Sequence, residues 1–226
     1  MNKTVEDNLG KLAMLLVFGV LTYQQSLSLI AVVANRGSVP FWELSLIARL
    51  FATVFLGLVL YFTITRLPPR DTAEGILPRI VAIAGTFIMM TLIVLPSARI
   101  GLTLQLIATM LIIVGTVLSI VCIYRLGRSF SIMATARKLV TTGAYRYVRH
   151  PLYAAELITI VGVVLANLSP AAIAVGVLWL GLQIQRIHYE EAVLRKSFPE
   201  YNAYAARVPM LVPGLSPRAR PGGKAV

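Results

Sequence analysis

Long apolar stretches recur along this sequence and constrain its fold more than any other feature. The first four approach or exceed the about 20 residues that an α-helix needs to cross the hydrocarbon core of a bilayer. They cover residues 12–34, 44–65, 80–96 and 102–124. Charged residues make up 13% of the chain, whereas soluble domains carry about 25%. We therefore predict an all-α polytopic membrane protein in which these stretches form four transmembrane helices.

Two shorter apolar stretches follow, at residues 152–166 and 171–184, with Asn167-Leu168-Ser169-Pro170 between them. That composition is typical of a turn. A helix of about 15 residues is only about 22 Å long, so neither arm would span the membrane comfortably if it were straight. We predict a C-terminal helical hairpin whose arms enter and leave on one side and are extended by flanking residues such as Gln183–Tyr189. A cytosolic C-terminal segment and a disordered tail at residues 215–226 follow it.

The basic residues predict the orientation of the chain. With the N-terminus placed in the cytoplasm, all but Arg36, Arg49 and Arg99 of the 21 Lys and Arg residues fall on the cytoplasmic side, as the positive-inside rule requires. Both termini are then cytoplasmic. The net charge of +12 reflects this bias and the attraction of membrane lipids, so we expect no nucleic-acid partner. Arg49 lies inside an apolar stretch and is expected to form an interhelical hydrogen bond.

Several kinds of site are excluded by residue counts and motifs. The chain has one cysteine, Cys122, and two histidines, which excludes an internal disulfide and argues against a transition-metal site. The dinucleotide-binding and P-loop motifs are absent from the sequence. We therefore expect no metal, and we place Cys122 in the helical core.

A cluster of basic and aromatic residues precedes the hairpin. Pro151 suits the first position of a helix, which puts His150 at the helix entrance beside free backbone N–H groups. Arg149 adds a fixed charge, and such a corner can hold a carboxylate or a phosphate. Tyr147 and Tyr153 flank it. The alternative interpretation is a basic, aromatic belt that anchors the protein at the membrane interface.

A second cluster, Arg186-Ile187-His188-Tyr189-Glu190-Glu191, follows the last apolar arm. Carboxylates here can bind hydroxyl or amino groups of a cofactor, and the hairpin would return them to His150. The alternative is helical salt pairing, because Arg186 with Glu190 and Glu191 with Arg195 are spaced i, i+4. Glu156, a carboxylate in the first turn of the first arm, is either functional or stabilised there by the helix dipole.

The C-terminal part of the chain, about residues 125–214, contains a series of motifs in a particular order. These are Leu126-Gly127-Arg128-Ser129-Phe130-Ser131, Leu139-Val140-Thr141-Thr142-Gly143-Ala144-Tyr145, Arg149-His150-Pro151-x-Tyr153, Glu190-Glu191-x-x-Leu194-x-x-x-Phe198-x-x-Tyr201-x-x-Tyr204, and Arg207-Val208-Pro209. In order and spacing, these motifs resemble those of the isoprenylcysteine carboxyl methyltransferase family. Ala155 stands where the family commonly has glycine.

The resemblance implies S-adenosylmethionine as methyl donor and a lipophilic methyl acceptor such as the carboxylate of a prenylated cysteine. By position it implies that the cofactor is bound by Tyr147, Arg149, His150, Tyr153, Glu190 and Glu191. It implies that Arg207 lies near the acceptor, and we assign Arg207 and Glu190 to the reaction. If the acceptor were an amine or a thiol, His188 or Glu156 would be the candidate base.

This interpretation divides the chain into N-terminal transmembrane helices (1–100), a methyltransferase core (101–214) and the tail (215–226). Other functions remain open from the sequence. The wider superfamily includes phospholipid N-methyltransferases, thiol methylases and NADPH-dependent sterol reductases. A non-enzymatic membrane protein would also explain the apolar helices and the charge bias, but not the ordered motifs.

Overall fold

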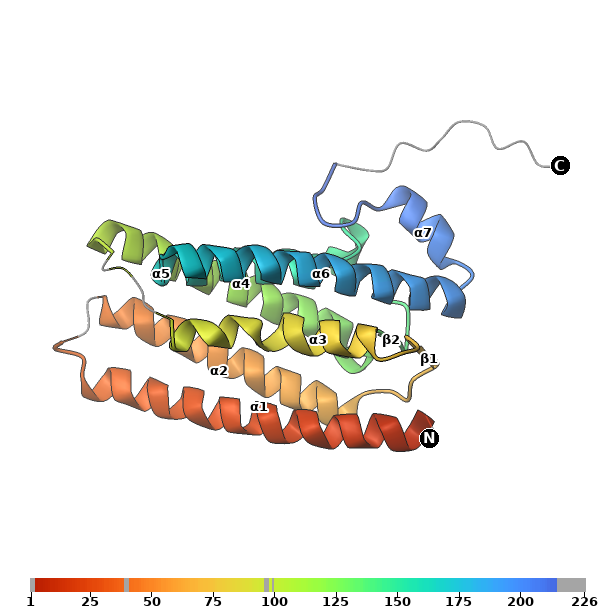
Figure 1. Cartoon of the computed structure of the whole chain (residues 1–226), viewed down its shortest axis with the longest axis horizontal. Coiled ribbons are helices and arrows are strands. Elements are labelled where there is room, and N and C mark those ends of the chain that lie inside the picture. The colour runs from red at the N-terminus through yellow and green to blue at the C-terminus, as the bar shows by residue number, and fades with distance from the viewer. Residues whose placement is uncertain (1–2, 39–40, 96–97, 99, 215–226) are drawn as a thin grey trace.

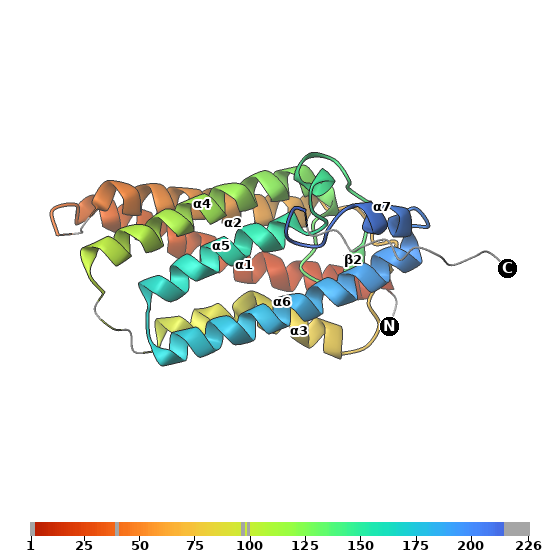
Figure 2. The ribbon, with the colours of Figure 1, turned by 90° about the horizontal axis from the view of Figure 1, so that it is seen from above.

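Helices α1 to α6 lie alongside one another, with successive helices running in opposite directions (Figures 1 and 2). The computed structural model describes residues 3–38, 41–95, 98 and 100–214. The elements are α1 (Lys3–Ala34), α2 (Trp42–Thr65), β1 (Asp71–Thr72), α3 (Leu77–Phe87), α4 (Leu102–Leu126), β2 (Thr135–Ala136), α5 (Pro151–Ala166), α6 (Pro170–Ser197) and α7 (Tyr201–Arg207), with 3-10 turns at Ile88–Ile93, Gly127–Ser129 and Gly143–Arg146. The predicted tail, 215–226, lies outside the described residues.

Among the described residues, four helices are long and apolar enough to cross a membrane, and they lie at Gly10–Ala34, Trp42–Thr65, Leu102–Ser129 and Pro170–Ser197. Many large apolar side chains on these helices are exposed, for example Leu16, Ile30 and Val177, as lipid-facing residues of a membrane protein would be. The all-α membrane class predicted from the sequence is therefore confirmed.

The set of long helices differs from the predicted one. The stretch 80–96 does not form one long helix, because α3 ends at Phe87 and the chain continues as a 3-10 turn over Ile88–Ile93. Thr86, Phe87 and Ile88, at this change, have weaker helix propensities than the leucine-rich and alanine-rich segments elsewhere. The second arm extends beyond its apolar residues 171–184, as predicted, but further than 189, because α6 continues as one helix to Ser197. Its polar extension is rich in helix formers.

The turn between α5 and α6 occupies the expected residues. Ser169 caps α6, and its side chain accepts a hydrogen bond from the backbone N–H of Ala172 at 3.1 Å. Pro170 occupies the first turn of the helix, where its missing N–H costs nothing. The Asn167 side chain donates back to the Val163 carbonyl at 2.9 Å. As a result α6 runs antiparallel to α5 and returns to the end of the bundle where α5 begins (Figure 2).

Two glycines let α4 and α5 pack closely. A Cβ atom built on Gly115 of α4 would lie 2.5 Å from the Thr159 backbone nitrogen, and one on Gly162 of α5 would lie 2.7 Å from the Ala108 carbonyl oxygen. Both distances are too short for any larger residue without movement of the backbone. Small residues at such crossings are how membrane helices approach each other. This contact fixes the start of α5 beside the loop that follows α4.

The predicted core and interhelical contacts are present. Cys122 is buried in a core cluster with Phe18, Phe62 and Ile123, which confirms its assignment. The Arg49 guanidinium of α2 donates to the Ser28 hydroxyl of α1, which confirms the predicted interhelical bond.

The start of α1, the strands and α7 gather at one end of the bundle (Figure 1). Strands β1 and β2 pair antiparallel, with Asp71 opposite Ala136 and Thr72 opposite Thr135. This short ribbon is an addition to the predicted all-α fold. It joins the loop after α2 to the loop after α4, so the N-terminal helices help to position the loop that precedes α5.

Candidate active site

The entrance of α5 is held by the segment that follows α7. His150 is the N-terminal cap and Pro151 the first residue of the helix, as the sequence predicts. The backbone N–H groups of Arg149 and His150 donate to the carbonyls of Pro209 and Met210, at 2.8 and 3.0 Å. The corner before α5 is therefore built from two chain segments about 60 residues apart in the sequence.

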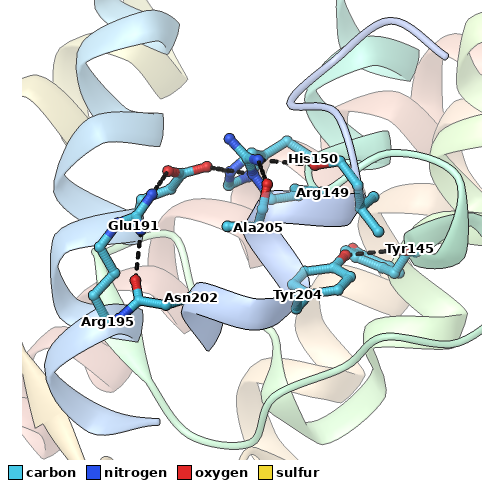
Figure 3. Close-up of polar contacts among 9 residues, drawn as sticks. Tyr145, Arg149, His150, Glu191, Arg195, Asn202, Tyr204 and Ala205 are labelled. Carbon is cyan, nitrogen blue, oxygen red and sulfur yellow. Dashed lines mark hydrogen bonds and ion pairs between the residues drawn. The ribbon is translucent and has the colours of Figure 1, made fainter. Parts of the chain in front are cut away.

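Glu191 of α6 lies at the centre of the polar contacts shown in Figure 3. One of its carboxylate oxygens is 2.7 Å from Arg149 Nε and 3.2 Å from His150 Nε2. The other accepts a hydrogen bond from Arg195 at 3.0 Å. His150 is 4% exposed and Glu191 is 8% exposed. The structure thus brings the two polar clusters of the sequence together, and the helical Glu191–Arg195 pair exists beside this longer-range contact.

Glu190 is joined to α5 by a separate contact. The Tyr153 hydroxyl donates to Glu190 Oε2 at 3.0 Å. The Arg186 guanidinium lies 5.3 Å from the centre of the Tyr153 ring and donates to Gln183 at 2.8 Å. Glu190 is partly buried and lies at the edge of the site. The hydrogen bond from Tyr153 fixes one of its carboxylate oxygens.

Glu156 lies deeper along α5. It accepts a hydrogen bond from the Gln183 side chain at 3.3 Å. Through Gln183 it connects to Arg186, and so to the ring of Tyr153. Glu156 is therefore linked to Tyr153, the partner of Glu190, only through Gln183 and Arg186, and it does not lie at the entrance of α5.

Helix α7 packs over the corner and fixes Arg149. The Arg149 Nη1 atom donates to the carbonyls of Ala205 and Val208 at 2.7 and 2.8 Å. The Tyr204 hydroxyl donates to the Tyr145 carbonyl at 2.6 Å. Burial raises the pKa of Tyr204 to about 12, an effect that the Arg149 charge opposes and the Glu191 charge supports. The phenol of Tyr204 is therefore protonated at neutral pH and acts as a hydrogen-bond donor.

A small cavity of about 50 Å³ lies among these groups. We call it the small cavity. Its lining includes Arg149, His150 and Glu190 together with Tyr145, Tyr201, Tyr204 and the loop residues Ser131, Met133, Thr135, Arg137, Lys138 and Leu139. Pockets that enclose ligands usually measure about 300–1,000 Å³. Several polar side chains around it are paired with one another, among them Arg149 with Glu191 and Tyr153 with Glu190.

Four of the predicted site residues do not line this cavity, namely Tyr147, Tyr153, Glu191 and Arg207. Tyr153 and Glu191 contact residues that do line it, whereas Tyr147 and Arg207 lie apart from it. Tyr147 is 67% exposed, and its backbone N–H closes the 3-10 turn by donating to Ala144. Arg207 is exposed at the end of α7, where its Nε donates to the Ala203 carbonyl at 3.1 Å. His188, the other candidate base, is also exposed.

The residue-by-residue predictions missed the aromatic lining of the cavity. Tyr145, Tyr201 and Tyr204 belong to the quoted motifs, and the three-residue spacing of the last two places them on one side of a helix. Their role in the lining followed only from the docking of α7. Arg137 and Lys138 belong to the loop between α4 and α5. The sequence of this loop has no periodicity that would predict where their side chains lie.

The described residues contain no group of three or more His, Cys, Asp or Glu side chains placed to hold a metal ion. The chemistry of the corner is instead that of a carboxylate-rich, tyrosine-lined site with fixed positive charges.

Comparison with known proteins places relatives over this region. Residues 104–201 match the family model described as phospholipid methyltransferase. Protein-S-isoprenylcysteine O-methyltransferase B of Arabidopsis thaliana is 40% identical over 110 residues, which are 46% of this chain and 56% of the relative. The probable protein-S-isoprenylcysteine O-methyltransferase of Oryza sativa subsp. indica is 40% identical over 107 residues, 43% of this chain and 55% of the relative.

A relative with a different kind of name is also similar to this chain. The nickel-cobalt-cadmium resistance protein NccN of Alcaligenes xylosoxydans xylosoxydans is 39% identical over 80 residues, which are 35% of this chain and 38% of the relative. The chain therefore spans little more than half the length of the two plant relatives, and less of this one.

Proposed function

We propose that the chain is an integral membrane methyltransferase that uses S-adenosylmethionine, which the match of residues 104–201 to the phospholipid methyltransferase family model supports. The observation that carries the proposal is the meeting of the α5 entrance with the Glu190–Glu191 pair of α6. The names of the two plant relatives support methyl transfer to a prenylated cysteine or a similar amphiphile as the reaction.

The donor set of the small cavity fits this cofactor. Glu190 offers carboxylate oxygens to the ribose hydroxyls or to the amino group, and the rings of Tyr145, Tyr201 and Tyr204 line the space for a purine. The first turn of α5 supplies backbone N–H groups of the kind that bind carboxylates. The small cavity has a volume of about 50 Å³, which is too small for S-adenosylmethionine. We therefore expect α7 and the segment at 208–210 to move when the cofactor enters.

When bound, S-adenosylmethionine supplies a methyl group on a positively charged sulfonium sulfur. Methyl transfer to an ionised carboxylate breaks the S–CH3 bond, forms an O–CH3 bond and releases no proton, so it needs no general base. The contribution of the protein is then alignment, which can supply on the order of 7–11 kcal/mol in well-oriented systems.

Each residue of the corner has a distinct part in that alignment. Glu191 acts as a positioning residue, because it fixes Arg149 and His150. Tyr153 fixes Glu190, the carboxylate that we propose contacts the cofactor. The role of Arg207 near the acceptor stays a prediction, as does that of Tyr147 at the cofactor.

Calorimetric titration of the detergent-purified protein tests the proposal. We expect S-adenosylmethionine to bind the wild type, and Glu190→Ala and His150→Ala to abolish binding while the protein still inserts and unfolds cooperatively. Glu43→Ala, at the opposite end of the bundle in the first turn of α2, is the matched loss of a carboxylate and should bind normally. Wild-type affinity in both site variants would remove the assignment.

A thermal-shift comparison separates the reductase alternative. A ligand that binds only the folded state raises the melting temperature, so we expect a shift with S-adenosylmethionine and none with NADPH. A shift with NADPH alone would favour the sterol-reductase type of chemistry. If neither ligand produced a shift, a non-enzymatic role would be favoured.

A further inference from the structure

A second, larger cavity lies on the other side of the loop that borders the small cavity. We call it the large cavity. Its volume is about 390 Å³, which is within the range of ligand pockets. It lies between α1 and the start of α3, at the end of the bundle that also carries β1, β2 and α7 (Figure 1). Ser131, Met133 and Thr135 line both cavities, so one segment of chain forms the wall between them.

At this place two buried guanidinium groups share one carboxylate. Asp7 of α1, which lines the large cavity, pairs with two guanidinium groups, those of Arg66 and Arg137, each at 2.8 Å. The two arginine side chains are 5% and 1% exposed, and Asp7 is 23% exposed. Among the described residues, the Nε atoms of both arginines are buried without a hydrogen-bond partner.

Glu74, the other acid of the lining, lies away from these arginines. It is 82% exposed and contacts Lys196 at 3.3 Å. Burial and the nearby charge of Arg137 lower the pKa of Arg66, and Asp7 only partly opposes them. Among the side chains that the structure describes, two buried guanidinium groups thus share the carboxylate of Asp7, and a second anion beside Arg66 would be favoured.

The inner part of the large cavity is apolar. Asp7, Gly10 and Met14 are spaced three and four residues apart on α1 and so lie on one face, which runs from a charged end to an apolar one. One turn beyond Met14, α1 meets α3 where the Phe18 and Phe87 rings lie 6.0 Å apart. Pro78 and Met133 complete the apolar lining.

We propose that the large cavity binds the head of the methyl acceptor, a single-chain amphiphile whose carboxylate lies at Arg66 and whose chain leaves along α1 and α3. This proposal rests on the proposed function. Met133, which faces both cavities, has the flexible side chain that can open a path through the wall. The acceptor carboxylate would thus be recognised by Arg66 of the N-terminal half, a part of the chain outside the family match at 104–201.

A cavity-filling variant provides the test, with a matched control on the same helix. Gly10 lines the cavity, and a Cβ atom at Gly10 or at Gly19 would meet nothing within 4 Å. Gly10→Leu should therefore fill the cavity, and Gly19→Leu should leave it open, without strain in either case. The probes are N-acetyl-S-farnesylcysteine and its neutral methyl ester, and the readout is the affinity for the protein in nanodiscs without any cofactor.

We expect the wild type and Gly19→Leu to bind the acid more tightly than the ester. Gly10→Leu should lose this binding, and Arg66→Gln should weaken binding of the acid by about tenfold or more, the effect of one charged hydrogen bond. Arg36→Gln, in the exposed turn that follows α1, removes an arginine that lines neither cavity and should bind as the wild type does. If Gly10→Leu binds the acid with wild-type affinity, or if the acid has no advantage over the ester in the wild type, the proposal is wrong.

A separate titration keeps the two proposals distinguishable. Gly10→Leu should still bind S-adenosylmethionine, because the filled cavity lies beyond the wall from the cofactor residues. If no variant binds S-adenosylmethionine while the acid follows the expected pattern, the cofactor assignment fails and the amphiphile site stands. If Gly10→Leu neither binds the acid nor unfolds cooperatively as the wild type does, the affinity of Arg66→Gln for the acid decides. A wild-type affinity of Arg66→Gln for the acid would overturn the proposal.

Discussion

A single carboxylate organises the corner at the start of α5. Glu191 accepts from Arg149, Arg195 and His150, which belong to two different segments of the chain. Breaking a buried ion pair by removing one partner costs roughly 3–5 kcal/mol, because the other charge is left without compensation. Glu190, its neighbour, accepts a hydrogen bond from Tyr153, and the contacts of the described residues give it no ion pair. The two adjacent acids should therefore respond differently to substitution.

We predict that Glu191→Gln lowers the unfolding free energy by a few kcal/mol, because Arg149 stays buried when its ion pair is lost. Glu190→Gln should lower it by about 1 kcal/mol or less, the usual value of one hydrogen bond, while weakening cofactor binding. Thermal unfolding of both variants in the same detergent measures the difference. Equal stability of the two would show that Glu191 does not have the structural role assigned to it.

The sequence predicted the identity of these residues better than their partners. The i, i+4 spacing indicated the Glu191–Arg195 pair, which the structure contains. The same spacing suggested Arg186 with Glu190, but Arg186 donates to Gln183 and to the Ile132 carbonyl. Tertiary contacts outweigh a helical pair worth only a few tenths of a kcal/mol. The exposure of Tyr147 and Arg207 also depends on loop geometry that residue spacing does not determine.

Among the helices, the position of α5 depends on its close contact with α4. Gly115 and Gly162 permit that contact, and α5 presents His150 and Tyr153 to α6. The sequence predicted both helices to within a few residues, because long apolar stretches define them. It did not predict this contact, since a glycine in an apolar stretch does not show which helix it faces.

We predict that Gly115→Ala destabilises the protein by about 1–3 kcal/mol, the usual cost of overpacking, and weakens cofactor binding by displacing α5. The control is Gly57→Ala on α2, where a Cβ atom would meet nothing within 4 Å. Melting temperatures and cofactor titration of both variants test this. A Gly115→Ala protein as stable as the Gly57→Ala protein would contradict the close-packing account.

The docking of α7 gives a prediction at alkaline pH. The pKa of Tyr204 is raised by burial from its ordinary value of 10.0 to about 12, so the folded state favours the protonated phenol. Its contribution to stability is complete below pH 10 and is lost as the pH rises through 12. Tyr204→Phe should be less stable than the wild type by about 1 kcal/mol at pH 8.

That difference in stability should shrink as the pH rises from 9 to 11.5. Melting temperatures of the two proteins over this range measure it, with Tyr61→Phe, an exposed tyrosine of α2, as the control. A difference that stays constant with pH would mean that the Tyr204 hydroxyl does not hold α7 on the corner.

At the scale of the whole molecule, hydropathy and charge predicted the class and the antiparallel order of the helices. Three of the four predicted long helices are confirmed, but the apolar stretch at 80–96 is divided at Phe87, and α6 extends further beyond its apolar part than predicted. Hydropathy and charge also did not show that the first helix borders a cavity next to the motif-bearing loop. Asp7 contacts Arg137, 130 positions away, and no local pattern predicts such a contact.

The central claim is that the ends of α5 and α6 and the docked α7 together bind S-adenosylmethionine at one end of a membrane bundle. Ultraviolet cross-linking of the methyl-labelled cofactor to the detergent-purified protein, followed by mass spectrometry of its peptides, tests this most directly. We predict that the label maps to residues 145–153 and 190–204, and that excess unlabelled cofactor removes it. Specific label confined to α1, α2 or α3, or no specific label at all, would contradict the account.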